Sequence, residues 1–322
     1  MPGGVAREGV PGKGMAGAPA AAADSEVPIT RKIPFAARFA RPRLWWLVVP
    51  MLALFVIFFV VPLASLFAIS FDKPLAGSVT LRGDFVLTNF ERIFTRPLYY
   101  DAILNSLGIS AAVALLALLL GYPLAFLIAK TEHPGRNTLL MILVLSSMQL
   151  DTVIRLYGMM VLLGDTGLIN GALRWAGLIS RPLPLMYNVF GVVVGLVQIT
   201  LPFMVLSLIA VIRSIHPSLE EAARSLGASQ WSAFRFIVLP LSVPGILAGT
   251  LLVFALSISS YVVPALMGGW KVQVMPIHIY QQISEMGRWQ FGAAIAVVLF
   301  VTSMIAVFVY DRVAVRASGG RT

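Results

Sequence analysis

Six long apolar runs dominate the chain and limit it to one class of fold. Each run has at least the roughly 20 residues that an α-helix needs to cross the hydrocarbon core of a bilayer. Hydrophobic residues make up 58% of the chain and charged residues only 12%, against about 25% charged residues in soluble domains. This excludes an ordinary cytosolic enzyme, a disordered protein and a coiled coil, and it predicts an all-α integral membrane protein. The predicted transmembrane helices are residues 44–71, 103–129, 139–163, 188–212, 246–267 and 291–310.

The segments between the apolar runs determine the predicted orientation. With the N-terminus inside, the inner segments carry 15 of the 24 lysine and arginine residues and the outer segments carry eight. Basic residues gather on the cytoplasmic side of a membrane, so we expect both termini there. The net charge of +10 then reflects topology and contact with membrane lipid, and it does not indicate nucleic-acid binding. Residues 1–43 predict a disordered basic tail, and residues 313–322 predict a short cytoplasmic C-terminal tail.

The cytoplasmic loop 213–245 has helical sequence patterns of its own. Ser218 follows a proline and Glu221 comes three residues later, which predicts a capping box at the start of a short helix. Gly227 is placed to end that helix, and a second helical segment is predicted over residues 229–239. The loop either presents a surface to another protein or lies on lipid as an amphipathic segment. The helical pattern favours neither interpretation.

The same loop resembles the EAA signature of ATP-binding-cassette (ABC) importer permeases. The resemblance implies a type I, MetI-like permease architecture with six transmembrane helices within residues 44–312, in a bacterial inner membrane. In that family the loop contains the coupling helix, which sits in a groove of the ATPase. The matching positions are Glu221, Ala222, Ala223, Gly227, Ile237, Leu239 and Pro240.

The importer interpretation also implies partners. No phosphate-binding loop of the form GxxxxGK[ST] occurs in the chain, so ATP is expected to be bound and hydrolysed by a separate ABC ATPase dimer. The resemblance further implies a second permease subunit, identical or different, and a periplasmic or lipoprotein substrate-binding protein. A gradient-driven transporter is the second candidate, although no clear internal repeat is visible. An intramembrane enzyme or a metal site is disfavoured, because there is no cysteine and the three histidines are not at ligand spacing.

Four short segments are similar to the spermidine/putrescine branch of these permeases. This similarity implies a polyamine or related amine as the transported solute. Ferric iron and organophosphonates are the alternatives, and the lack of an acidic residue in 262–265 counts against polyamine. The four segments are residues 97–99, 120–123, 154–158 and 266–269.

Polar residues inside the apolar runs are candidates for the translocation pathway. Asp151 and Arg155 lie four residues apart, so they are predicted to share one face of the third helix. They either form a mutually satisfied pair or line the pathway, where Asp151 could meet a cationic amine. The resemblance adds Tyr157. The cluster Ser259, Ser260 and Tyr261 is the further pathway candidate, whereas most other polar groups in the runs are expected to bond within their own helices.

Overall fold

The computed structural model describes residues 42–73, 83–131 and 133–317, with side chains between residues 48 and 313. The predicted tail residues 1–41 and 318–322 lie outside this part. The chain forms two compact units, Met1–Val56 and Ile57–Thr322, and the second contains all elements from α2 onward. The elements are α1 (Pro42–Phe55), η2 (Val56–Val60), α2 (Val61–Ser70), α3 (Thr88–Thr95), α4 (Pro97–Lys130), α5 (Pro134–Gln149), α6 (Thr152–Leu163), α7 (Leu168–Trp175), α8 (Val189–Ser214), α9 (Pro217–Ser225), α10 (Gln230–Ala233), η3 (Phe234–Val238), α11 (Leu239–Leu241), α12 (Val243–Ile258), α13 (Val262–Met267), α14 (Met275–Tyr280), η4 (Gln281–Glu285) and α15 (Trp289–Ala317).

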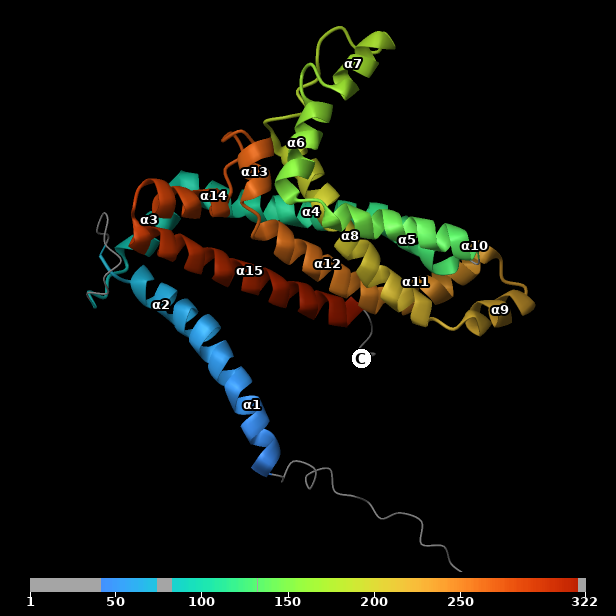
Figure 1. Cartoon of the computed structure of the whole chain (residues 1–322), viewed down its shortest axis with the longest axis horizontal. Helices are drawn as coiled ribbons and strands as arrows, with labels where there is room; N and C mark the ends of the chain where they lie inside the picture. Colours follow the sequence, from blue (N-terminus) through green and yellow to red (C-terminus); the bar gives the residue numbers. More distant parts are fainter. Residues whose placement is uncertain (1–41, 74–82, 132, 318–322) are drawn as a thin grey trace, which may run out of the picture. The chain divides into compact units, whose positions relative to one another are not determined.

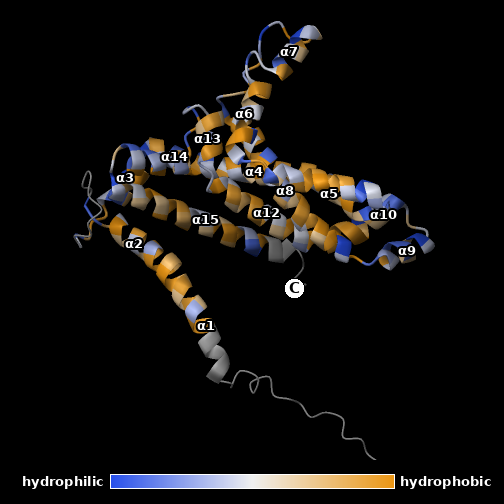
Figure 2. Ribbon diagram, viewed as in Figure 1, coloured by the Kyte–Doolittle hydropathy of each residue, from blue (hydrophilic) through white to orange (hydrophobic). Residues whose placement is uncertain are grey.

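The all-helical prediction is confirmed in the part of the chain that the structure describes. Five helices are long and apolar enough to cross a membrane, and a sixth is added if a pair bent by 60° counts as one span. Apolar residues cover these helices, whereas α9 and the neighbouring loops are hydrophilic (Figure 2). The five spans are Val48–Ser70, Pro97–Lys130, Thr152–Trp175, Val189–Ser214 and Trp289–Val313, and the bent pair is Gln230–Leu241 with Val243–Ile258.

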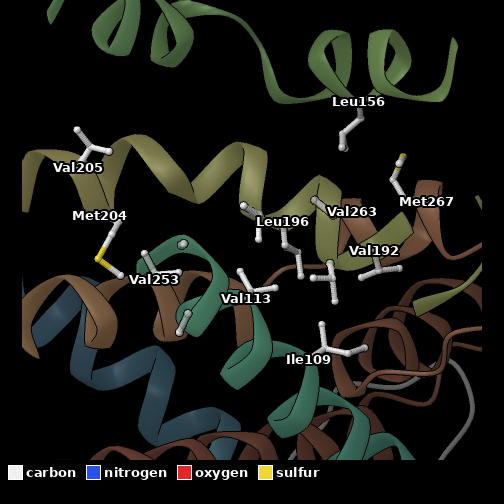
Figure 3. Close-up of a cluster of buried hydrophobic side chains, with 14 of the residues drawn as sticks. Ile109, Val113, Leu156, Val192, Leu196, Met204, Val205, Val253, Val263 and Met267 are labelled. Atoms are coloured by element: carbon white, nitrogen blue, oxygen red, sulfur yellow. The ribbon is translucent and has the colours of Figure 1, made fainter. Parts of the chain in front are cut away.

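Helices α4, α8 and α12 pack against one another and form the centre of the second unit. Their buried side chains interlock in one apolar cluster, which includes Val113, Met204 and Val253 (Figure 3). Gly245 lets α12 approach α8 closely, because a Cβ atom at this position would lie 2.9 Å from the Cβ of Val211. Small residues at such contacts are typical of helix packing in membranes, where close van der Waals contact replaces the hydrophobic effect.

The prediction of one continuous helix over residues 139–163 is wrong. α5 ends at Gln149 and α6 begins at Thr152, in a different direction from α5 (Figure 1). The cause is Asp151, whose short side chain competes for backbone N–H groups and therefore favours a helix start over a helix interior. α5 has 16 residues, and the candidate span here is Thr152–Trp175.

The predicted helix 246–267 is also interrupted. α12 ends at Ile258 and α13 begins at Val262, so the predicted cluster Ser259, Ser260 and Tyr261 forms the break itself. In contrast, α4 and α8 continue through Pro123 and Pro202.

The second unit has two different ends (Figure 1). One end carries α9 and α10 and is called the loop end below. At the other end α3, α14, α15 and the start of α4 enclose a second buried cluster. There the Tyr99 ring meets the rings of His278 at 5.2 Å and Phe291 at 5.3 Å, and the Arg92 guanidinium lies 4.6 Å from the Phe291 centroid.

Candidate functional site

The first helix of the 213–245 loop begins at Pro217, so its cap is the residue before Pro217 and not Ser218. His216 is the N-cap of α9, and its Nδ1 accepts a hydrogen bond from the Ser218 backbone N–H at 3.3 Å. The predicted capping box of Ser218 with Glu221 is therefore wrong. Pro217 explains the difference, because proline favours the first helical position and leaves the preceding residue as the cap.

The end of α9 at Gly227 is confirmed. Gly227 has φ +89°, its N–H donates to Arg224 O at 3.0 Å, and Ala228 N–H donates to Ala223 O at 3.0 Å. These two bonds form a Schellman motif, which requires a left-handed residue that glycine adopts without strain. A Cβ atom on Gly227 would meet nothing within 4 Å. Backbone conformation, and not lack of space, therefore explains the glycine.

The surface of α9 is open to a partner. None of its nine residues is buried, and the signature residues Glu221 and Ala222 are exposed, with Ala223 half-buried. Directly after the helix, Leu226 is 90% exposed. A highly exposed apolar side chain is typical of a protein–protein contact surface. The small alanines nearby would let another protein approach closely.

The second half of the loop is fixed to the bundle by aromatic rings. Ser229 caps α10 by accepting from the Ser232 N–H at 3.2 Å. The Phe234 ring lies 5.2 Å from the Phe126 ring of α4 and 5.3 Å from the Trp231 ring. Edge-to-face and stacked pairs at these distances are attractive. Nothing in the residue pattern of the loop indicates the contact with α4.

The remaining signature residues lie in this fixed half. Ile237 and Leu239 are half-buried beside the fully buried Val238, whereas Pro240 is exposed at the start of α11. The seven matched positions thus divide into an exposed group on α9, a turn at Gly227 and a packing group.

Two polar contacts at the loop end join segments far apart in the sequence. Lys130, the last residue of α4, forms an ion pair with Glu220 in the first turn of α9. Arg213 of α8 donates to Asn137 Oδ1 at 2.9 Å, and Asn137 Nδ2 donates to Ile128 O at 3.2 Å. Both contacts were missed, because sequence spacing shows only pairs that are close along the chain.

Asp151 and Arg155 do not form the predicted pair. The Asp151 carboxylate caps α6, where its Oδ1 accepts from Val153 N–H at 2.8 Å and Ile154 N–H at 3.3 Å. Arg155 instead donates to Ser147 O of α5 at 2.9 Å. Asp151 therefore caps the start of α6, and Arg155 joins α6 to α5 across the break. Asp151 remains exposed.

The other predicted pathway residues lie on neighbouring elements. Tyr157 is 56% exposed on α6, which packs against α13. In the break before α13, Ser259 bonds to Ala255 O at 2.9 Å, Ser260 is half-buried, and the Tyr261 ring stacks on the Tyr280 ring at 4.5 Å. The structure records no hydrogen bond between the α6 residues and those of the break among the residues it describes.

Four serines surround a small space between α4, α12 and α13. Ser106, Ser110, Ser257 and Ser260 line a cavity of about 10 Å³, roughly the room that one water molecule needs. Ser110 donates to Ser106 O, as predicted for such groups, but the buried Ser257 Oγ has no partner. This space has no room for a molecule much larger than water.

His278 is a further polar residue, which the sequence analysis did not assign to a functional site. It is buried at the end opposite the loop, and its Nε2 has no hydrogen-bond partner in the described structure. Burial lowers the pKa of His278, and a hydrogen bond with Gln281 opposes this shift.

Comparison with known proteins agrees with this architecture. A family model described as "Binding-protein-dependent transport system inner membrane component" matches residues 32–319. The chain is 38% identical over 228 residues to the spermidine/putrescine transport system permease protein PotB of Escherichia coli (strain K12), covering 71% of this chain and 82% of that protein.

Two solved structures share the fold. The bacterial alginate ABC transporter in complex with an alginate pentasaccharide-bound periplasmic protein matches with a TM-score of 0.69 and 20% identity, over 86% of this chain and 95% of that one. An inward-facing MetNI methionine ABC transporter matches with a TM-score of 0.53 and 17% identity, over 69% and 96%. The predicted type I permease architecture is confirmed.

Replacement of Asp151 separates its capping role from a pathway role. Asp151→Ala removes the acceptor for two N–H groups and destabilises the start of α6 by about 1 kcal/mol, whereas Asp151→Asn keeps the acceptor. Hydrogen exchange at Val153 and Ile154 should accelerate in the alanine variant only. Unchanged exchange in Asp151→Ala would contradict the capping role, and loss of transport in Asp151→Asn would show that the charge itself is needed.

Proposed function

Because the chain belongs to the family of binding-protein-dependent transport system inner membrane components, we propose that its 213–245 loop is the surface through which an ABC ATPase dimer drives transport. The chain is a multi-pass permease subunit of an ABC importer in the inner membrane, and it is not itself a catalytic subunit. The observation that carries the proposal is the exposed surface at α9. Glu221 and Ala222 on the helix and Leu226 directly after it are exposed, and no residue of α9 is buried.

The loop end faces the cytoplasm in this proposal, and so do both termini. The excess of lysine and arginine on that side, 15 against eight, supports this orientation. A substrate-binding protein then docks at the opposite end, as the periplasmic protein in the alginate transporter complex suggests. A second permease subunit, identical or different, completes the pathway. The basic tail 1–43 and the C-terminal residues 313–322 are cytoplasmic extensions of the permease domain 44–312.

The transport mechanism that fits these parts is alternating access. The space among the four serines has room for about one water molecule, and in alternating access a path for a larger solute opens when the helices move. ATP binding closes the ATPase dimer, the loop moves with it, and the bundle opens towards the other side. A change of this kind is a rigid-body rearrangement of packed elements.

The substrate in this proposal is a polyamine such as spermidine or putrescine. The 38% identity to PotB over most of both chains supports it. Asp151 adds a carboxylate that is exposed on α6, with Tyr157 on the same helix. These residues and Ser259, Ser260 and Tyr261 are the proposed pathway, whereas Arg155 positions α6 through Ser147. Ferric iron and organophosphonates remain the alternatives, since residues 262–265, directly before the 266–269 segment, include no acidic residue.

Docking of the ATPase is tested by placing a charge at Leu226, directly after α9. Leu226→Asp should reduce the ATPase that co-purifies with the tagged permease by at least about tenfold, as loss of an interface hot spot does. Leu178→Asp is the matched control, because Leu178 is also highly exposed but lies outside the loop. Equal recovery of the ATPase with both variants would refute docking at α9.

The substrate is tested by uptake. Cells that lack their own polyamine importers and express the complete transporter should accumulate labelled putrescine or spermidine, and Leu226→Asp should abolish the uptake. Ferric iron and a phosphonate are measured in parallel. Uptake of either without uptake of a polyamine would contradict the polyamine assignment and leave the docking result unaffected.

A further inference from the structure

Helix α9 is weakly held by apolar packing. None of its residues is buried, and its neighbours are chiefly α10 and η3, which follow it in the chain. A helix of nine residues is not stable alone in water. Its position relative to the transmembrane helices therefore depends on specific polar contacts.

The Lys130–Glu220 ion pair is such a contact. It joins α4 to α9 across 90 residues of sequence, and both side chains are only 25% exposed. Water and salt screen a pair so covered less than a pair on an open surface. In the described part of the chain, it is the only side-chain hydrogen bond from α9 to a transmembrane helix.

The ion pair also lies between two hollows in the structure. Lys130 and Glu220 line a cavity of about 360 Å³ next to the end of α8, and they also line a second cavity of about 1020 Å³ next to Trp231 and Phe234. These two hollows leave space beside the pair, so α9 has room to shift once the pair is lost.

Each charge suits the helix end that carries it. Lys130 is at the C-terminal end of α4, and Glu220 is in the first turn of α9. A cation is stabilised at the negative end of a helix dipole and an anion at the positive end. The pair is therefore expected to be more stable with the lysine on α4 and the glutamate on α9 than with the two residues exchanged.

The α4 side of the pair is firmly anchored. Asn137 of α5 bonds to Ile128 O of α4 and accepts from Arg213 of α8, so three helix ends are tied together beside Lys130. α4 in turn packs most extensively on α8 and α12. A displacement that reaches Lys130 is therefore passed to the centre of the bundle.

We propose that the Lys130–Glu220 pair is the link that transmits movement of α9 into α4. The two adjacent glutamates then have different roles: Glu221 is exposed towards the ATPase, and Glu220 points to the permease's own helix. Lys130 and Glu220 are positioning residues, and the inference rests on the proposed coupling function of the loop.

The first test measures whether the pair fixes α9. The chain has no cysteine, so spin labels can be placed at Leu226→Cys and Leu139→Cys, both exposed positions, in the full chain in nanodiscs. The distance distribution should be narrow in the parent chain and in Glu221→Gln, the matched control, and broad in Lys130→Gln and Glu220→Gln. Equally narrow distributions in all four would overturn the proposal.

Charge reversal shows whether the two residues act as a pair. Lys130→Glu or Glu220→Lys alone places like charges together and should broaden the distribution most. The double variant should be narrower than either single variant, but broader than the parent, because its charges oppose the helix dipoles. A double variant no narrower than the single variants would overturn the ion-pair role.

The second test measures transmission in the assembled complex with the ATPase, the second permease and the binding protein. Labels at Leu127→Cys on α4 and Val309→Cys on α15 report movement of the α4 end. ATP with vanadate should shift this distance in the parent complex and not in Lys130→Gln, although the ATPase stays bound. A shift that persists in Lys130→Gln, or no shift in the parent, would overturn the proposal.

These results are distinguishable from failure of the proposed docking. If α9 is not the ATPase surface, Leu226→Asp retains the ATPase whatever the spin labels show. If docking holds and only transmission fails, Leu226→Asp loses the ATPase while the shift at α4 persists in Lys130→Gln.

Discussion

A bilayer offers no hydrogen-bond partner to the peptide backbone, and this constraint governs the whole chain. It requires helices wherever the chain meets lipid, and it requires compensation wherever a helix stops. Between α5 and α6 that compensation is visible: Asp151 accepts from two backbone N–H groups and Arg155 donates to Ser147 O. Asp151 thus both interrupts the third apolar run and supplies a partner for the backbone at the start of α6, while Arg155 joins α6 to α5.

The 213–245 loop combines two kinds of attachment. Its second half contains the buried Val238 and is packed on α4 by the Phe234 ring, whereas its first half is exposed and joined to α4 through Lys130 and Glu220. A packed base and an exposed helix suit the proposed role of receiving force from an ATPase and passing it to the bundle. The EAA-like signature therefore mixes surface positions with packing positions.

Sequence reasoning predicted what depends on local patterns. The apolar runs predicted the helical membrane fold, and Gly227 was correctly assigned as the end of α9, because both follow from periodicity and turn chemistry. Pro217 also carried the information that the cap is His216, but Ser218 was preferred. The Lys130–Glu220 pair and the aromatic contact of Phe234 with α4 could not be predicted, since they depend on how distant helices pack.

In the proposed complex, the exposed half of the loop meets the ATPase and the packed half does not. Site-specific photo-crosslinking in native membranes tests this arrangement, with the crosslinker placed in turn at Ala222 and at Ile237, which are exposed and half-buried respectively. We expect a crosslink to the ATPase from Ala222 and none from Ile237. No ATPase crosslink from Ala222, or equal crosslinking from both positions, would refute the arrangement.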